Sequence, residues 1–280
     1  MAYFLAVASA VLYGSADFLG GLSAKRVNTT AVVVVSQLAG MVLLAVMMPW
    51  LPGGFPSAVD VALGAAAGLT GGAGVALLYA ALAAGTMAVV APTTAVCAVT
   101  IPVAAGILLG ERPGVRVFVG IGVALLAIVL VSRPRTDDAR DPASSSGLGL
   151  ALLSGVAIGL FFLSLARSST TAGLWPLLVA RVVSVGLFGA GAAVTGIPLR
   201  MERRSAITVV AAGALDMLAN ALYLIATRHG SLTAVVTLSS LYPASTVVLA
   251  RIVLGERFSR AQGVGIACAL LAVVLIVGGN

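Results

Sequence analysis

Long apolar runs alternate with short polar gaps along almost the entire chain. Each run is close to the length of about 20 residues at which an α-helix crosses a lipid bilayer. We therefore predict ten membrane-spanning helices, at 3–22, 31–49, 59–82, 87–109, 115–131, 148–166, 172–195, 205–227, 232–254 and 261–277. The first run has no basic residue before it and no cleavage-like segment after it, so we interpret it as a retained helix rather than as a signal peptide.

One polar gap is much longer than the others. Residues 133–146 read RPRTDDARDPASSS, a composition that keeps a segment solvated. This gap separates two sets of five predicted helices. We predict a first half at 1–132, a polar linker at 133–146 and a second half at 147–280.

The second half repeats the first at a fixed offset of 145 residues. Leu-Gly-Glu-Arg occurs at 109–112 and again at 254–257, and residues 119–131 match residues 264–276 at nine of thirteen positions. Because each half holds an odd number of spans, the second half enters the membrane from the opposite side. The predicted fold class is an all-α integral membrane protein with ten transmembrane helices in two inverted five-helix repeats.

The composition excludes a soluble globular protein, because 60% of the residues are hydrophobic and only 9% are charged. A net charge of +7 would favour nucleic acid in a soluble protein, but most arginines here lie in the gaps, where they anchor helices at lipid headgroups. Cys97 and Cys268 lie inside apolar runs without metal-ligand spacing, so we expect them to pack. We predict neither a nucleic-acid partner nor a metal site.

The predicted architecture favours a transporter. Secondary transporters are commonly built from inverted halves, with a substrate site near the midplane between them. Neither half contains a GxxxxGK[ST] phosphate loop, and no polar segment is long enough for an ATPase domain. No metal cluster or nucleophile–base pair indicates an enzyme. We predict transport that is not driven by ATP on this chain; a non-transporting membrane scaffold or partner subunit is the alternative.

These features resemble the EamA-like branch of the drug/metabolite transporter superfamily. The resemblance rests on the two five-helix copies, the Gly-Glu-Arg after the fourth helix of each, the Gly-rich fifth helices and Pro243 in the ninth helix. It implies an exporter or permease of small polar or amphipathic metabolites, amino acids or drugs in the inner or plasma membrane, without a cofactor. The second helix departs from the common pattern, with Ser36 and Gln37 where the seventh has Arg181.

Asp17 is an acid well inside the first predicted helix, and Gly14 and Gly21 share its face. Ionisable groups within a bilayer cost several kcal/mol unless they face a cavity or a partner. Two interpretations are open. Asp17 contributes to a cavity that binds substrate or a coupled proton, or it meets Lys25 or Arg26 at the membrane interface.

The eighth predicted helix carries a polar stripe, because Asp216, Asn220 and Tyr223 recur at i, i+4 and i+7. The third helix has Gly71 in place of the acid. The stripe is either a substrate or ion site or a structural network between helices. Small residues on the third helix form a face for close helix packing: Gly64, Gly68 and Gly72.

Arg181 lies near the middle of the seventh helix and, being always protonated, needs an anion, a carbonyl group or water. Counted from the connection between the seventh and eighth helices, Asp216 and Arg181 lie about 16 and 21 Å deep. An arginine side chain can span that difference. We predict that the two side chains pair, and that an anionic or zwitterionic substrate, or a proton on Asp216, competes for the pair. Direct binding of substrate by Arg181 is the alternative.

Two prolines and two glutamates lie at special places in the repeats. Pro92 and Pro243 free backbone carbonyl groups, so we expect bends beside a cavity there, with Tyr242 as a further substrate candidate. Glu111 and Glu256 belong to the repeated tetrapeptide and lie at span ends. We interpret both as structural residues that fix hairpins by favouring the N-terminus of the following helix.

The orientation in the membrane has two opposing indications. The odd-numbered gaps hold ten Lys and Arg residues, and the even-numbered gaps hold four when Arg116, at the very start of the fifth span, is counted with them. By the positive-inside rule this distribution places both termini outside. Proteins that resemble this family commonly keep both termini in the cytoplasm.

Overall fold

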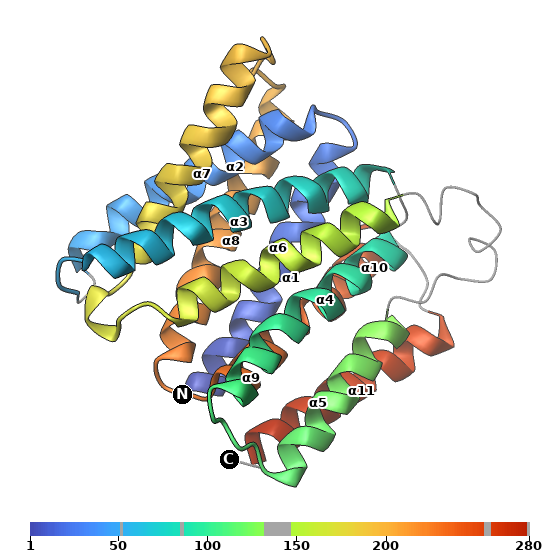
Figure 1. Ribbon diagram of the computed structural model, residues 1–280. Coiled ribbons are helices and arrows are strands. Elements are labelled where there is room, and N and C mark those ends of the chain that lie inside the picture. Colours follow the sequence, from blue (N-terminus) through green and yellow to red (C-terminus); the bar gives the residue numbers. More distant parts are fainter. Residues whose placement is uncertain (51–52, 85–86, 132–146, 255–258, 279–280) are drawn as a thin grey trace.

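The computed structural model describes residues 1–50, 53–84, 87–131, 147–254 and 259–278, and this part of the chain is helical apart from short connections (Figure 1). The predicted spans agree with the helices to within three residues, except that the ninth span is divided. The predicted linker lies outside the described residues. The helices are α1 (Ala2–Ala24), α2 (Thr29–Met47), η1 (Met48–Trp50), α3 (Ala58–Ala84), α4 (Met87–Leu108), α5 (Val115–Val131), α6 (Leu148–Ala166), η4 (Thr170–Ala172), α7 (Trp175–Val194), α8 (Arg203–Thr227), α9 (Leu232–Ser239), α10 (Tyr242–Leu254) and α11 (Arg260–Gly278).

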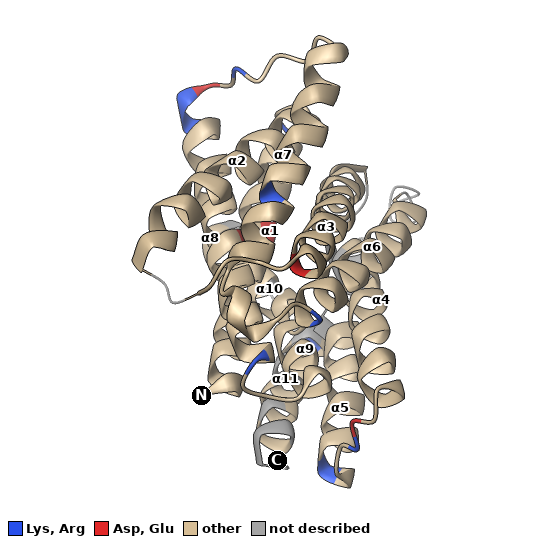
Figure 2. Ribbon diagram, turned by 60° about the vertical axis from the view of Figure 1, so that its left-hand side comes forward, with Lys and Arg blue, Asp and Glu red and all other residues tan. Residues whose placement is uncertain are grey.

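Six helices in the described residues are long and apolar enough to cross a membrane: α1, α2 with η1, α3, α6, α7 and α8. Their outward-facing side chains are apolar, as Leu153 on α6 and Val182 on α7 illustrate, which are 60% and 55% exposed. Figure 2 shows long stretches of helix without Lys, Arg, Asp or Glu. Surfaces of this kind are stable against hydrocarbon and not against water. The protein is therefore an integral membrane protein.

Helices of the two halves pack against each other (Figure 1). α1 lies along α8, and the helices at the equivalent places in the repeat, α6 and α3, also lie along each other. α2 packs against α8, and the equivalent helices α7 and α3 also pack against each other. α5 packs against its own equivalent, α11. The pattern of contacts is thus retained when the halves are exchanged, and both halves build the interior.

Two of the closest helix contacts depend on glycine at equivalent positions. A Cβ atom added at Gly68 would lie 2.5 Å from the Ala180 carbonyl oxygen on α7, and one at Gly213 would lie 2.0 Å from the Ser36 carbonyl oxygen on α2. Gly68 and Gly213 are 145 positions apart. No side chain fits at either place, so the small-residue face predicted on the third helix is confirmed as a packing surface.

The helix that was predicted at 232–254 is interrupted. α9 ends at Ser239 and α10 begins at Tyr242, immediately before Pro243. Proline lacks an N–H donor, and its ring clashes with the carbonyl group one turn earlier, which accounts for the break at this place. α4 continues through Pro92, the other proline at which a bend was predicted.

Glu111 caps a helix of the other half. Its Oε1 accepts a hydrogen bond from the Leu232 N–H at 2.7 Å and its Oε2 accepts one from the Thr233 N–H at 3.0 Å, at the start of α9. The expectation that Glu111 favours the following helix, α5, was therefore wrong. A carboxylate stabilises whichever helix N-terminus the fold brings to it. Gly110, with a φ of +98°, forms the turn before it. Glu256 lies outside the described residues.

Replacing Glu111 by glutamine is expected to lower the free energy of unfolding by about 1–2 kcal/mol, because the amide can accept only one of the two hydrogen bonds and carries no charge. Unfolding in detergent micelles measures the change. Glu202→Gln is the matched control, since Glu202 precedes α8 without a side-chain cap and its loss should change stability by less than about 0.5 kcal/mol. Equal effects of the two substitutions would contradict the cap.

A second polar cluster joins the start of α3 to the connection between α6 and α7. Asp60 Oδ1 accepts a hydrogen bond from the Ser169 N–H at 2.7 Å, and its Oδ2 accepts one from the Ser57 N–H at 3.0 Å. The Ser57 hydroxyl accepts one from the Asp60 N–H at 3.2 Å, which completes a capping box. Arg228 donates to the Ser169 and Gly173 carbonyl oxygens. Burial lowers the pKa of the Arg228 guanidinium, and the Asp60 carboxylate partly offsets this shift.

Candidate functional site

A cavity lies between the halves, where α1, α2, α3, α6, α7 and α8 meet the start of α10. Five of the six substrate or ion candidates identified from the sequence line it: Asp17, Arg181, Asp216, Asn220 and Tyr242. The sixth, Tyr223, does not. Several lining residues were not among the candidates: Gln37, which was noted only as a departure from the family pattern, and Tyr13, Phe161, Phe162 and Ser184.

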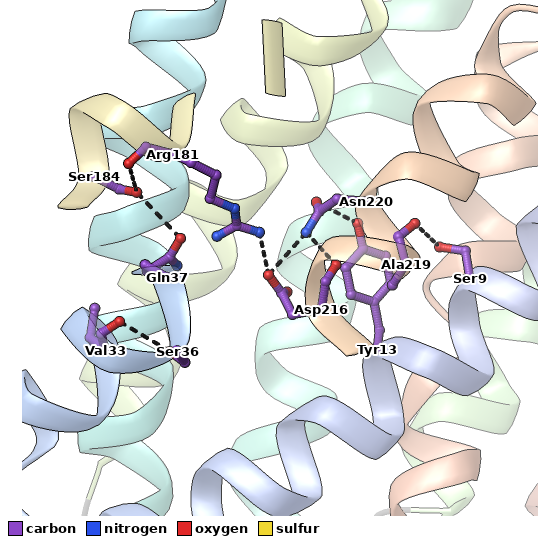
Figure 3. A network of polar contacts seen from close by, with 10 residues as sticks. All are labelled: Ser9, Tyr13, Val33, Ser36, Gln37, Arg181, Ser184, Asp216, Ala219 and Asn220. Carbon is purple, nitrogen blue, oxygen red and sulfur yellow. Dashed lines mark hydrogen bonds and ion pairs between the residues drawn. The ribbon is translucent and has the colours of Figure 1, made fainter. Parts of the chain in front are cut away.

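Arg181 and Asp216 form an ion pair in the wall of this cavity (Figure 3). Arg181 Nη2 donates to Asp216 Oδ2, and the two side chains are 8% and 20% exposed. Among the described residues this is the only ion pair. The pairing predicted from depth along the two helices is confirmed. Each charge compensates the other, since either alone would be costly in a membrane interior.

Asn220 and Tyr13 extend the ion pair into a network that reaches α1 (Figure 3). Asn220 lies one turn after Asp216, and its Nδ2 donates to Asp216 Oδ2 at 3.1 Å and to the Asp216 carbonyl oxygen at 2.7 Å. Tyr13 Oη donates to Asn220 Oδ1 at 2.8 Å. The network thus connects α7 and α8 of the second half to α1 of the first, so any movement between the halves at this place changes it.

A separate polar contact joins α2 to α7 beside the ion pair (Figure 3). The Ser184 hydroxyl lies 3.3 Å from Gln37 Oε1 and 3.2 Å from the Arg181 carbonyl oxygen, to either of which it can donate. Both side chains are buried and line the cavity. The second helix therefore contributes a neutral amide near the place where the seventh contributes the Arg181 charge.

Asp17 lines the same cavity from α1 and is half-buried. Within the described part of the chain, which includes Lys25 and Arg26, no basic side chain forms an ion pair with it. The interpretation in which Asp17 meets Lys25 or Arg26 at the interface was therefore wrong. An interior carboxylate without a fixed counter-ion is the kind of group that binds a cation or a proton.

Aromatic side chains from both halves line or support the cavity. Tyr13 contacts Phe162 and Tyr242 edge to face, with ring centroids 5.7 and 6.5 Å apart. Tyr223 packs against Phe162 at 4.6 Å and donates to the Phe162 carbonyl oxygen at 3.1 Å, so it orders the wall from behind. The Tyr242 hydroxyl is buried and has no hydrogen-bond partner in the part of the chain described, which leaves it free for a bound molecule.

The repeat offset reveals that the cavity is asymmetric in polarity. For four of its polar residues, the residue 145 positions away in the other half also lines the cavity. Each counterpart is apolar or is glycine. The pairs are Tyr13 with Ile158, Asp17 with Phe162, Asp216 with Gly71 and Asn220 with Val75. Phe162 could therefore have been identified from the sequence as a lining residue, because it is the counterpart of Asp17 in the other half.

An all-helical membrane protein with a polar cavity between two interlocked halves has the architecture of a transporter. The model of the EamA-like transporter family matches residues 1–133 and 145–278. The chain therefore belongs to the EamA-like transporter family, and the resemblance noted in the sequence is confirmed. Members of this family are transporters rather than enzymes.

A solved structure described as "Crystal structure of protein" is similar to the whole chain. The TM-score is 0.74, and the match covers 98% of this chain and 95% of the other at 16% sequence identity. Likeness at this identity establishes a shared fold. No curated protein matches the chain.

Proposed function

We propose that the protein is a secondary transporter that moves small amphipathic molecules across the inner or plasma membrane by alternating access. The observation that carries the proposal is the charged cavity between the halves, lined by Asp17 from the first and by Arg181 and Asp216 from the second. Such groups are costly in a membrane unless they bind a ligand, an ion or each other. Arg181 and Asp216 are paired and Asp17 is not, within the described residues. A membrane scaffold has no need of an unpaired interior acid.

The proposal includes ten spans in two inverted repeats, 1–132 and 147–280. Six long helices supply six of the spans, and α4, α5, α11 and the α9–α10 pair supply the other four. The family match to both halves and the exchange symmetry of the helix contacts support this arrangement. An odd number of spans in each half inverts the second relative to the first.

Two features of the cavity suit alternating access. The network from Arg181 to Tyr13 changes whenever α1 moves against α8, so its hydrogen bonds distinguish one arrangement of the halves from another. The break between α9 and α10 places Tyr242 at a helix start beside the cavity. Transporters use interrupted helices of this kind at their substrate sites.

The cavity favours a substrate with one charged end and an apolar body. With both carboxylates ionised, Asp17, Asp216 and Arg181 carry one net negative charge, which favours a cationic group or a coupled proton. The apolar counterparts of the polar positions, Phe162 among them, offer a surface for the body of the molecule. An anionic or zwitterionic substrate would instead displace Asp216 from Arg181.

Transport by purified protein in proteoliposomes tests this function. The panel consists of labelled amines that share one charged group and differ in the size of the apolar body. We expect protein-dependent transport of the amphipathic members, driven by a proton or ion gradient. Phe162→Ala should weaken the apparent affinity for these members by about tenfold and leave the smallest amine unchanged.

Phe118→Ala is the matched control for this experiment, because Phe118 lies on α5 outside the cavity and is 49% exposed. It should change transport of no member of the panel. Absence of transport across the panel would contradict the proposed transport of cationic amphipathic molecules. An equal effect of the two substitutions would contradict the assigned apolar surface.

A further inference from the structure

A groove of about 550 Å³ lies between α1, α8 and α10, and it shares no lining residue with the cavity between the halves. Two of its lining residues, Arg26 and Arg204, are basic. Its large remaining side chains are apolar, among them Leu19, Leu22, Leu215 and Leu249. The groove therefore combines positive charge with a long apolar surface.

Arg26 and Arg204 have no counter-ion in the described residues, since Arg181 with Asp216 is the one ion pair found there. Both side chains are exposed, and so is Glu202, which pairs with neither. Glu202 also makes no side-chain cap to α8. The first N–H groups of that helix therefore add to the positive potential beside Arg204. An anion would be favoured at this end of the groove.

The length of the groove matches one leaflet of a bilayer. Arg26 lies just beyond the end of α1 and Arg204 is the second residue of α8, so both lie at the membrane interface. Ser15 and Leu215, the most distant lining residues on these helices, are each eleven residues away. That separation is roughly 16 Å along a helix, and half of the hydrocarbon core is about 15 Å. The groove runs from the headgroups to the midplane.

The place that the repeat relates to this groove, at α6, α3 and α4, has different chemistry. The residues 145 positions before Arg204 and Ser205 are Val59 and Asp60. Asp60 is buried and accepts a hydrogen bond from the Ser169 N–H at 2.7 Å, so protein groups occupy that position. The basic groove therefore has no basic counterpart at the place related to it by the repeat, and it is not an automatic result of the duplication.

We propose that this groove binds an anionic phospholipid, with the phosphate between Arg26 and Arg204 and an acyl chain along the leucines. Guanidinium groups bind phosphate through charge and paired hydrogen bonds, and basic pockets between transmembrane helices recognise anionic headgroups. A free anion would leave the apolar length of the groove unused. A zwitterionic phospholipid would bring its own ammonium group beside the two arginines and so leave their positive charge uncompensated. The bound lipid contacts α1, the helix that also carries Asp17.

Native mass spectrometry of the protein in detergent tests the proposal with phosphatidylglycerol and phosphatidylcholine of matched acyl chains. Phosphatidylglycerol should remain bound in preference to phosphatidylcholine. Combining Arg26→Gln with Arg204→Gln should weaken phosphatidylglycerol binding by about 30-fold. Arg203→Gln is the matched control, since Arg203 is exposed on the same helix turn without lining the groove, and it should leave binding unchanged.

Two further arms separate a lipid site from a site for free anions. Leu249→Trp fills the groove without changing its charge and should release phosphatidylglycerol, with folding verified by circular dichroism and gel filtration. Millimolar inorganic phosphate should not displace the lipid. The proposal is overturned if either the double arginine variant or Leu249→Trp retains phosphatidylglycerol, if phosphatidylcholine binds equally, or if inorganic phosphate displaces the lipid.

Discussion

Removing either charge of the Arg181–Asp216 pair is expected to destabilise the protein strongly. Arg181→Ala leaves the Asp216 carboxylate without its counter-ion, and Asp216→Ala leaves the guanidinium without one, both in the wall of an interior cavity. Stranding one member of a buried pair costs about 3–5 kcal/mol, a large part of a total stability of about 5–15 kcal/mol. Each variant should unfold in detergent at a lower temperature or denaturant concentration than the unmodified protein, and each should lose transport.

The double variant separates the structural part of the pair from its functional part. With both side chains truncated to alanine no charge is stranded, so much of the lost stability should return while transport stays absent. Unfolding measured for the four proteins of this cycle yields the interaction energy between the two residues. Stability losses that simply add would contradict the pairing. Transport restored in the double variant would limit the pair to a structural role.

Asp17→Asn is expected to abolish gradient-driven transport and its dependence on pH without weakening the fold. Asparagine has nearly the same shape, and Asp17 has no ionic partner to lose within the described residues. Removing a charge from the interior should therefore leave the free energy of unfolding unchanged or raise it. Transport of an amine from the panel, measured across pH, should fall by more than about tenfold, the effect of about 1.4 kcal/mol of lost interaction.

Asp60→Asn makes the same chemical change outside the cavity and serves as the control. The Asp60 carboxylate accepts hydrogen bonds from Ser57 and Ser169, so the expected result is the reverse: lower stability with an unchanged pH profile of transport. If the pH profile of transport in the Asp17→Asn variant equals that of the unmodified protein, Asp17 has no part in coupling. The same conclusion follows if Asp60→Asn changes the pH profile as much as Asp17→Asn does.

The helices could be predicted almost completely because a bilayer is a simple solvent. Every backbone polar group in hydrocarbon needs a partner within its own segment, so an apolar run of sufficient length is a helix whatever it packs against. The exception is the break between Ser239 and Tyr242. Pro243 predicted a bend there, but whether a proline bends a helix or divides it depends on what surrounds the freed backbone groups.

The polar part of the candidate site could be predicted and the apolar part could not. Asp17, Arg181 and Asp216 stand out because charge is rare and costly in a membrane. Phe162 does not stand out, because an aromatic side chain is stable against lipid, against a neighbouring helix and in a cavity alike. Tyr223 shares a helix face with Asp216, yet Phe162 covers it. Periodicity identifies the face of a helix and not the groups that cover it.

By itself the sequence determined the duplicated membrane architecture and the few polar groups that the interior must accommodate, because the cost of a polar group in hydrocarbon acts wherever the helix packs. The pairing of Arg181 with Asp216 was also within its reach, since a short connection sets the relative depth of α7 and α8. Only the tertiary structure decided that Asp17 meets no cation among the described residues and that Glu111 caps α9, whose first residue, Leu232, lies 121 positions further on. Those outcomes depend on which helices close packing brings together across the two halves, and no local pattern along the chain contains that information.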